Sequence, residues 1–319
     1  MKLKMVLATA SLLIAGHCIA SQQEQDKEPA PTPQKEQSTE SSTTSTLEET
    51  ADYLRGNLDV FMQDTAAWLD GLSMYESDTH RARAKGYVQL SWLPQRANLG
   101  EFDAKFKVKF YLPKWENRIS LVLDNDDEDD LKLDYEAEPI IQEDSDRLNI
   151  ALQSLTEFEN LLSLKYRLGL SRGQLYARTE LKKSFVFSNF EFSVSPRIDY
   201  FSSDGWAPGL KSAVTYPMGK DLISASVSWQ KFQFEPYAEE KAGIYWVRNL
   251  EDEKLLVSGV QYVKYSDGID AYLTSVRYRE KIYKDWAYLE VEPFVLFKKP
   301  LDYRREFGIG LRLISTYGE

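Results

Sequence analysis

The segment Phe102–Tyr111 reads FDAKFKVKFY, and this alternation guides the interpretation of the whole chain. Apolar residues alternate with polar ones that include Lys105, Lys107 and Lys109, so a β-strand would place the two sets on opposite faces of a sheet. A soluble sandwich buries the apolar face, whereas a transmembrane barrel turns it toward lipid and turns the charges toward the lumen. Similar alternation recurs to the C-terminus, most clearly in Phe190–Asp199, and it predicts an all-β fold of one of these two kinds.

The N-terminus favours the membrane barrel. Residues 1–20 combine a basic start, an apolar run and small residues before Ser21, which is the pattern of a secretory signal peptide. Cleavage after Ala20 would remove Cys18, the one cysteine of the chain, so we expect no disulfide in the exported protein. No later segment has the roughly 18 unbroken apolar residues of a transmembrane helix. We therefore expect the outer membrane of a Gram-negative bacterium as the destination.

Acidic residues are concentrated outside the expected strands. The formal charge is −11, and residues 21–50 carry seven acids and two lysines. Residues 124–146 carry twelve acids and one lysine, so the strand region that remains is mildly basic. Residues 21–46 are rich in Gln, Glu, Ser, Thr and Pro, which predicts a disordered periplasmic tether. The sequence has no dense basic stripe on a recognisable module, so nucleic acid is not expected as a partner.

An amphipathic helix is expected over residues 47–75. Thr46–Glu49 has the spacing of a capping box, and apolar residues follow at steps of three and four with a break at Thr65. The helix could pack on the end or in the mouth of the barrel, dock a periplasmic partner, or lie on the membrane surface. Its acidic polar face disfavours anionic headgroups. The apolar stripe comprises Leu47, Ala51, Leu54, Leu58, Phe61, Trp68 and Leu72.

Fourteen strand segments are expected in a barrel over residues 81–319. Most have the ~9–11 residues that cross a bilayer as tilted strands, and glycine-containing turns such as Ser171–Gly173 and Ser266–Gly268 separate them. An even number keeps both ends in the periplasm, as bacterial single-chain barrels require. Two segments have the weakest pattern, 118–124 and 147–155, so a twelve-stranded barrel is the alternative. The segments are 81–93, 101–111, 118–124, 147–155, 161–170, 174–183, 189–200, 207–216, 221–234, 241–249, 254–265, 270–281, 285–298 and 304–317.

Aromatic residues gather near the ends of these segments, where the two aromatic girdles of a membrane barrel lie. Together with the signal peptide and the even strand number, this placement predicts a transmembrane antiparallel β-barrel rather than a sandwich. The residues are Trp92, Tyr111, Trp115, Tyr200, Trp206, Tyr216, Trp229, Tyr265, Trp286, Phe297 and Tyr317.

Three segments carry a family resemblance: Ala66–Asp70 before the first strand, the hairpin Val276–Pro293, and Gly308–Leu313 with an aromatic residue and a glycine near the C-terminus. Together they resemble an uncharacterised family of predicted proteobacterial outer-membrane β-barrel proteins. The resemblance covers the barrel and the helix before it, and it implies location and fold but no activity. Glu306–Leu313 is also similar to the signal read by the barrel-assembly machinery, although it ends six residues before the terminus. This implies that machinery as a partner during biogenesis, with outer-membrane lipid as the permanent surrounding.

The polar faces of the expected strands supply the candidate lumen-lining residues. Arg277 and Arg279 are expected beside Glu290 and Glu292, with Arg312 facing the same acids. Cross-strand ion pairs of this kind satisfy interior charge in a filled or narrow barrel. A basic excess of ten residues to five would instead attract anions into an open pore. The basic residues are Lys105, Lys107, Lys109, Lys165, Arg167, Arg178, Arg197, Arg277, Arg279 and Arg312, and the acidic ones are Glu180, Glu191, Asp199, Glu290 and Glu292.

Enzymatic and metal chemistry have little support. His17 leaves with the signal peptide, so a serine hydrolase acting on lipids, or a protease with an Asp–His pair, would depend on His80 alone. Asp124–Asp130 lacks the sixth-position glycine of an EF-hand loop, so the surface loop 125–146 is expected to attract cations only loosely. We expect no cofactor and no metal site.

The sequence therefore predicts a non-enzymatic outer-membrane β-barrel with a mildly basic lumen, acting as a narrow diffusion channel or as a structural barrel. One alternative is a scaffold that docks a periplasmic partner through residues 21–75. The less favoured alternative is a lipid-modifying hydrolase of the outer membrane.

Overall fold

The barrel lies within residues 83–318, and some of its connecting segments are not described. The expected signal peptide (1–20), the tether (21–46) and most of the acidic segment 125–146 lie outside the described residues. The structure, a computed structural model, describes residues 52–53, 55–56, 59–67, 83–94, 102–112, 119–125, 148–158, 161–171, 173–250 and 254–318.

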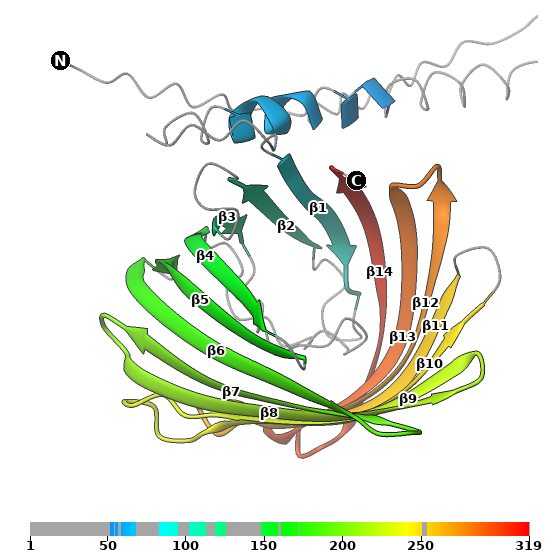
Figure 1. Ribbon diagram of the computed structural model, residues 1–319. Coiled ribbons are helices and arrows are strands. Elements are labelled where there is room, and N and C mark those ends of the chain that lie inside the picture. The colour runs from blue at the N-terminus through cyan, green and yellow to red at the C-terminus, as the bar shows by residue number, and fades with distance from the viewer. Residues whose placement is uncertain are drawn as a thin grey trace, which may run out of the picture. The chain divides into compact units, whose positions relative to one another are not determined.

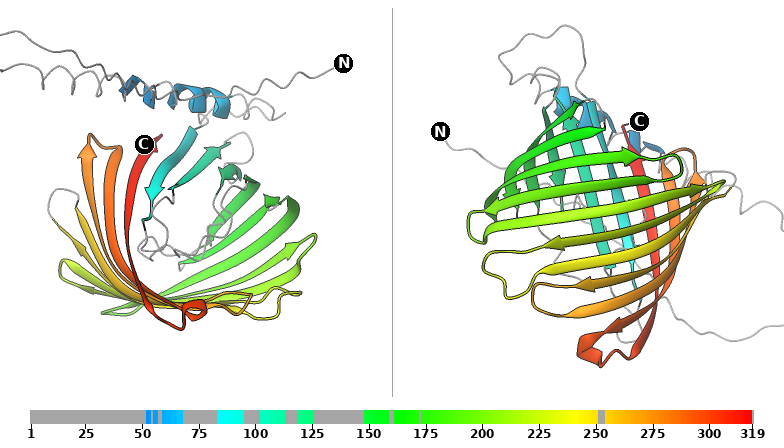
Figure 2. Two further views of the ribbon diagram at one scale, coloured as in Figure 1. Left: turned by 180° about the vertical axis from the view of Figure 1, so that it is seen from behind. Right: turned by 60° about the horizontal axis from the view of Figure 1, so that its bottom comes forward.

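Fourteen antiparallel strands close into a barrel, in which each strand pairs with its neighbours in sequence and β1 pairs with β14 (Figure 1). Figure 2 shows this order from two further directions. The strands are β1 (Arg83–Trp92), β2 (Phe102–Tyr111), β3 (Ile119–Asp124), β4 (Asn149–Phe158), β5 (Leu162–Ser171), β6 (Gln174–Val186), β7 (Glu191–Phe201), β8 (Gly205–Met218), β9 (Asp221–Gln230), β10 (Glu239–Asn249), β11 (Leu255–Lys264), β12 (Asp270–Tyr283), β13 (Ala287–Lys298) and β14 (Arg305–Tyr317), with a short 3-10 turn, η1 (Lys299–Leu301), before β14.

The prediction of a fourteen-stranded barrel is confirmed, and the twelve-stranded alternative is excluded. The two weakest segments of the sequence form β3 and β4, which pair with each other through Val122 and Ala151. β3 has six residues, fewer than the ~9–11 that a tilted strand needs to cross a bilayer alone. It is paired on both sides, so β2 and β4 supply partners for its backbone hydrogen-bonding groups.

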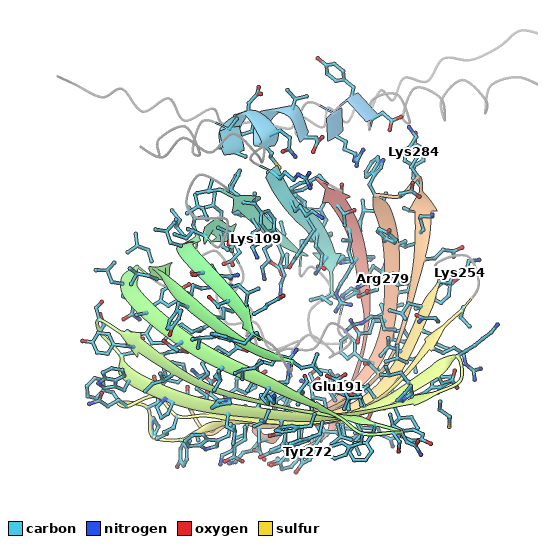
Figure 3. The ribbon with its side chains drawn as sticks, in the orientation of Figure 1. Lys109, Glu191, Lys254, Tyr272, Arg279 and Lys284 are labelled. Carbon is cyan, nitrogen blue, oxygen red and sulfur yellow. The ribbon has the colours of Figure 1, made fainter. Side chains whose placement is uncertain are left out.

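The alternation seen in the sequence separates an outer wall from an inner wall. On β2, Phe102 is 73% exposed on the outer wall, whereas Lys105 and Lys109 alternate with the apolar residues and lie on the inner wall. Figure 3 shows Lys109 and Arg279 on the inner side of the barrel and Tyr272 on the outer side. Because side chains alternate along every strand, the strand register extends these two walls around the barrel.

Aromatic residues lie at both ends of the outer wall. The terminal end is the barrel end at which β1 begins and β14 ends, and the far end is the opposite one. Two such belts are typical of the boundaries of a membrane-spanning barrel. At the far end the ring centroids of Trp92 and Phe102 are 5.8 Å apart, those of Tyr200 and Trp206 4.9 Å, and those of Tyr262 and Tyr272 5.1 Å. At the terminal end the corresponding distances are 4.6 Å for Phe187 and Phe190 and 5.5 Å for Tyr283 and Trp286.

Two aromatic rings lie flat on the inner wall because glycines leave room for them. The ring of Tyr245 covers Gly243 and Gly259, and a Cβ atom added to either glycine would meet that ring. Phe294 covers Gly308 on the neighbouring strand in the same way. Glycine inside a strand often marks such a close approach. These contacts join strands β10 and β11, and strands β13 and β14.

Helical residues precede the barrel, at 52–53, 55–56 and 59–67. Met62 and Ala66 are buried, whereas Phe61, a member of the apolar stripe expected from the sequence, is exposed. Among the described residues, the packed face of the helix therefore excludes Phe61. From its place in the alternation Phe110 was expected to face lipid. It is instead buried in one cluster with Met62 and Ala66. In the part of the chain that the structure describes, no helix is long and apolar enough to cross a membrane.

Candidate functional site

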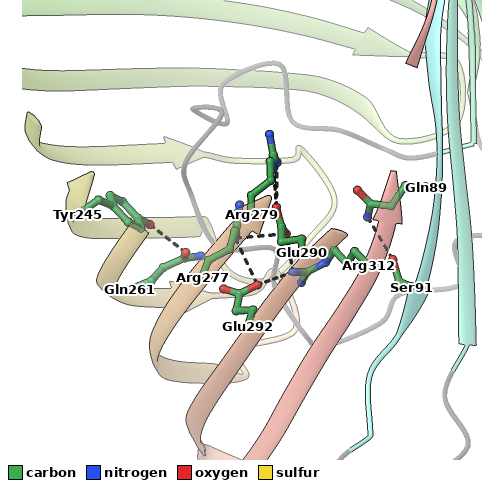
Figure 4. A network of polar contacts seen from close by, with 9 residues as sticks. All are labelled: Gln89, Ser91, Tyr245, Gln261, Arg277, Arg279, Glu290, Glu292 and Arg312. Carbon is green, nitrogen blue, oxygen red and sulfur yellow. Dashed lines mark hydrogen bonds and ion pairs between the residues drawn. The ribbon is translucent and has the colours of Figure 1, made fainter. Parts of the chain in front are cut away.

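Five charged residues of β12, β13 and β14 form one network on the inner wall (Figure 4). Alternation brings them together, because Glu290 lies directly opposite Arg279 on β12 and Arg312 on β14. Arg312 Nη1 donates to Glu290 Oε1 at 2.8 Å and to Glu292 Oε2 at 2.6 Å. Arg277 Nε lies 3.4 Å from one carboxylate oxygen of each glutamate, and Arg279 Nη2 lies 2.9 Å from Glu290 Oε2.

The burial of this network decides how it behaves. The Arg312, Glu290 and Glu292 side chains are almost completely shielded from solvent, and Arg279 is about one-third exposed. Buried charges are tolerated when they are paired and hydrogen-bonded. Here three guanidinium groups share two carboxylates, so a formal positive charge remains on this part of the inner wall. Arg312 Nη1 and Arg277 Nε each bridge the two glutamates, and these charge-assisted contacts hold the side chains in place.

A second group lies on β6, β7 and β9 and is centred on Asp199, whose side chain is 0% exposed. Arg178 Nε donates to Asp199 Oδ1 at 2.9 Å, and Arg197 Nε lies 3.3 Å from Oδ2. Gln230 Nε2 donates to the same Oδ2 at 3.0 Å. Glu180 on β6 lies directly opposite Arg197 in the register. This group also contains more basic than acidic members when Arg167 of β5, opposite Arg178, is included.

Amide side chains also take part in the polar contacts of the inner wall, and sequence analysis did not single them out. Gln153 Oε1 accepts from Arg167 Nη2 at 2.9 Å, and Asn149 Nδ2 donates to Asp124 Oδ1 at 2.9 Å. Gln261 Oε1 accepts from the Tyr245 hydroxyl at 2.9 Å. The signal available in the sequence was their position on the polar face of each strand. A neutral amide on that face does not by itself indicate which charged residue it meets.

The four predicted lysines lie on the same inner wall; the three on β2 lie outside the two arginine groups, whereas Lys165 faces the second one. Lys105, Lys107 and Lys109 lie opposite β1 residues of the inner wall, and Lys165 lies opposite Glu180. All four are partly exposed. The Lys109 ammonium lies 4.8 Å from the centroid of the Tyr111 ring. The structure thus places the twelve predicted lumen residues on one wall, in three groups rather than in one compact site.

The register adds further charged residues to the inner wall, and basic ones continue to outnumber acidic ones among the residues that the structure describes. The added basic residues are Arg83, Lys85, Lys182, Lys211, Lys241, Lys281 and Lys298, and the added acidic residues are Asp103, Asp124, Glu157, Glu239 and Glu306.

The residues to which the sequence analysis tied catalysis and loose cation binding are not described by the structure. His80 lies outside the described residues, as does most of the acidic segment 125–146. Within the described ranges, no group of three or more His, Cys, Asp or Glu side chains is arranged to hold a metal ion.

Known proteins resemble this chain in structure but not in sequence. No protein-family model matches the chain. No curated protein sequence matches it either. Among solved structures, the loop L8 deletion mutant of OmpT, an outer-membrane protein of Vibrio cholerae, is 11% identical and has a TM-score of 0.52, and the match covers 74% of this chain and 99% of that chain.

Two further structures match less well. The outer-membrane expressed OmpT of Vibrio cholerae is 12% identical with a TM-score of 0.49, and 76% of this chain and 99% of that chain are covered. An anion-selective porin from Comamonas acidovorans is 6% identical with a TM-score of 0.46, and 74% and 99% are covered. TM-scores below 0.5 give these two no weight. The first match and the closed antiparallel barrel give this chain the fold of an outer-membrane β-barrel. The resemblance to an uncharacterised family stays a prediction.

Proposed function

We propose that this protein is a narrow, non-enzymatic diffusion channel whose lumen favours small anions. The observation that carries the proposal is the excess of basic over acidic side chains on the inner wall. The network of three arginines and two glutamates on β12, β13 and β14 contributes to this excess. Charged side chains that line a pore select permeating ions by their sign. A narrow, low-dielectric wall strengthens this effect, because it focuses the field inside the pore.

The two kinds of basic residue have different roles in this proposal. The arginines are held against the wall by carboxylates and amides, so they define its shape and its positive balance. Lys105, Lys107 and Lys109 follow one another along the inner face of β2 and are partly exposed. A lysine side chain has a flexible four-carbon stem and a compact charge, so these three can approach a passing anion.

Ion selectivity in planar bilayers tests the proposal. The full chain should give single-channel steps, and a salt gradient of KCl should give a reversal potential of the sign expected for chloride preference. Combined Lys105→Glu, Lys107→Glu and Lys109→Glu substitutions should move this potential toward cation preference. Lys183→Glu is the matched control, because Lys183 lies on the outer wall with its ammonium 5.7 Å from the Phe185 ring centroid.

Two outcomes decide against the channel. Absence of any single-channel step from protein with heat-modifiable gel mobility would leave a structural barrel. Steps without chloride preference would remove the basic lumen from the proposal. If the triple glutamate variant does not fold, the same three positions changed to Gln should still reduce the preference for chloride.

The non-enzymatic part of the proposal has its own test, which is independent of conductance. In a strain that lacks the protein, wild-type and His80→Ala forms should give the same lipid profile. A lipid change that requires His80 would instead support the hydrolase alternative.

Docking of a periplasmic partner through residues 21–75 stays a separate prediction, because most of that segment lies outside the described residues. Pull-downs from periplasm with the full chain, compared with a chain that lacks residues 21–46, address it. Equal recovery with both forms would count against the tether as a docking segment.

A further inference from the structure

The helical segment before the barrel lies against the outer wall rather than in the lumen. Met62 and Ala66 are buried in one cluster with Ala84 of β1, Phe110 of β2 and Tyr317 of β14. Ala84 and Phe110 belong to the outer wall, because they alternate with the inner-wall residues of their strands. The helix therefore covers a patch of the surface that otherwise faces lipid, near the terminal end of the barrel.

A pair of hydrogen bonds fixes the helix to the first strand. Gln63 Nε2 donates to the Ala84 carbonyl oxygen at 3.1 Å, and the Ala84 backbone N–H donates to Gln63 Oε1 at 3.1 Å. The pairing of β1 with β14 begins only at Gly86, so Ala84 extends beyond the end of β14 pairing. The Gln63 amide thus satisfies backbone groups that have no β14 strand partner.

The other end of the helix contacts the turn between β12 and β13. Asp52 Oδ2 accepts from Lys284 Nζ at 2.7 Å and from the Tyr283 hydroxyl at 2.9 Å. The Arg55 guanidinium carbon lies 5.4 Å from the centroid of the Trp286 ring. Since β13 and β14 lie between that turn and β1, the helix crosses the seam at which the first and last strands close the barrel.

The barrel-facing residues leave a second apolar surface exposed. Asp52, Arg55, Met62 and Ala66 recur at helical spacing and face the barrel. Tyr53, Val60 and Phe61 lie off this face and are 69%, 60% and 67% exposed. Phe61 belongs to the apolar stripe that the sequence predicts, yet it is not used for packing against the barrel.

We propose that Tyr53, Val60 and Phe61 insert into the periplasmic leaflet of the outer membrane, so that the helix is both a seam strap and a membrane-interface anchor. Continuity of surface supports lipid as the occupant. The helix sits on the same outer wall that exposes Leu90 and Leu313, which face lipid in an outer-membrane barrel. Tyrosine and phenylalanine are well suited to the boundary between headgroups and acyl chains.

The charge of the helix defines the kind of lipid. Its described residues include three aspartates, at positions 52, 59 and 64, and one arginine, at position 55. An acidic segment gains nothing from anionic headgroups, in contrast to the basic amphipathic helices that bind them. Zwitterionic glycerophospholipid is therefore the expected contact, and anionic lipid should not improve it.

Spin labels on the full chain test this contact. In a Cys18→Ser background, which has no other cysteine, a nitroxide is attached at Phe61→Cys or Tyr53→Cys, and the protein is inserted in phosphatidylcholine vesicles at low protein-to-lipid ratio. Val260→Cys, exposed on the outer wall, is the lipid standard, and Asp267→Cys in a turn is the water standard. Collision with oxygen reports lipid, and collision with a soluble nickel chelate reports water.

Accessibility of the Phe61 label close to that of the Val260 standard is the expected result, with little change when one-third of the lipid is phosphatidylglycerol. Accessibility equal to that of the Asp267 standard would overturn the proposal. Shielding that appears only at high protein-to-lipid ratio would assign the surface to a second copy. Shielding that requires added periplasmic protein would assign it to a partner, and either result would also overturn the lipid contact. The labelled positions are exposed, so the labels should not prevent folding.

Discussion

Arg312 and Glu290 meet on adjacent strands with Nη1 and Oε1 at 2.8 Å, although each side chain is only 2% exposed. Both arrive at this point by alternation, since residues 290 and 312 are register partners on β13 and β14. Their contact is therefore a consequence of strand pairing. It also joins β14, the strand that closes the barrel, to β13. Arg312 is at the same time the register partner of Ser91 on β1.

Truncation of Arg312 should destabilise the barrel strongly. We expect Arg312→Ala to lower the free energy of unfolding by about 3–5 kcal/mol, because Glu290 and Glu292 each lose a buried hydrogen bond to a charged donor. Lys254→Ala is the control. Lys254 Nζ lies 3.1 Å from Glu280 Oε1, but both side chains are about one-third exposed, so its loss should cost less than about 1 kcal/mol. Urea unfolding in vesicles, followed by tryptophan fluorescence, measures both. Equal shifts would show that the inner network adds nothing to stability.

A methyl group at Gly308 should disturb the inner wall. The added Cβ atom would meet the ring of Phe294, which is itself buried, so we expect Gly308→Ala to lower stability by about 1–3 kcal/mol. Gly209→Ala is the matched control, because its Cβ atom would have neighbours only at 3.4 Å and beyond. The midpoint of heat-modifiable gel mobility compares them. Adding Phe294→Leu to Gly308→Ala should recover part of the lost stability. Equal midpoints for Gly308→Ala and Gly209→Ala would contradict the close contact between Gly308 and Phe294.

Removal of the Gln63 amide should loosen the seam. Gln63→Ala leaves the N–H and the carbonyl of Ala84 without their partner, and each unsatisfied buried group costs about 1–3 kcal/mol. Water reaches the barrel end, so we expect the lower end of this range for the pair. Asp64→Ala, at the exposed neighbouring position, should have almost no effect. Hydrogen exchange at Ala84 measures the local change. Unchanged protection of the Ala84 amide in Gln63→Ala would show that the two Gln63–Ala84 hydrogen bonds do not hold the helix to β1.

The attachment of the helix to the β12–β13 turn should depend on pH. The Lys284 ammonium, with the Tyr283 hydroxyl, lowers the pKa of Asp52 below its ordinary value of 3.8, and the Asp52 carboxylate raises the pKa of Lys284 above 10.5. A lowered carboxyl pKa contributes stability above pH 3.8 that is lost as pH falls through the folded pKa. A raised lysine pKa contributes stability below pH 10.5 that is lost as pH rises through the folded pKa.

The mobility of a spin label at Gly56→Cys reads out this attachment. We expect low mobility between these two limits and higher mobility beyond each of them. In Asp52→Asn the acidic increase should disappear, because no carboxyl group remains to be protonated. Persistence of the acidic increase in Asp52→Asn would assign the pH response to another group.

Much of the barrel could be predicted from local pattern. Alternation in Phe102–Tyr111 and in the later segments identified the strands, because a period of two is a property of each strand by itself. The same parity placed Arg277, Glu290 and Arg312 on one face. β3 and β4 were harder to predict, since their patterns are short and their formation depends on pairing with each other and with β2 and β5.

The sequence by itself determined the two walls and the excess of basic residues on the inner one, because these follow from parity along each strand, but it left twelve and fourteen strands open. Only the tertiary structure decided which amides complete the arginine groups and which face of the helix meets the barrel. Asp52 and Tyr283, for example, are 231 residues apart. Contacts of this kind depend on strand register and on the surface that closure creates. That is why Met62 and Ala66, and not Phe61, are buried against the wall.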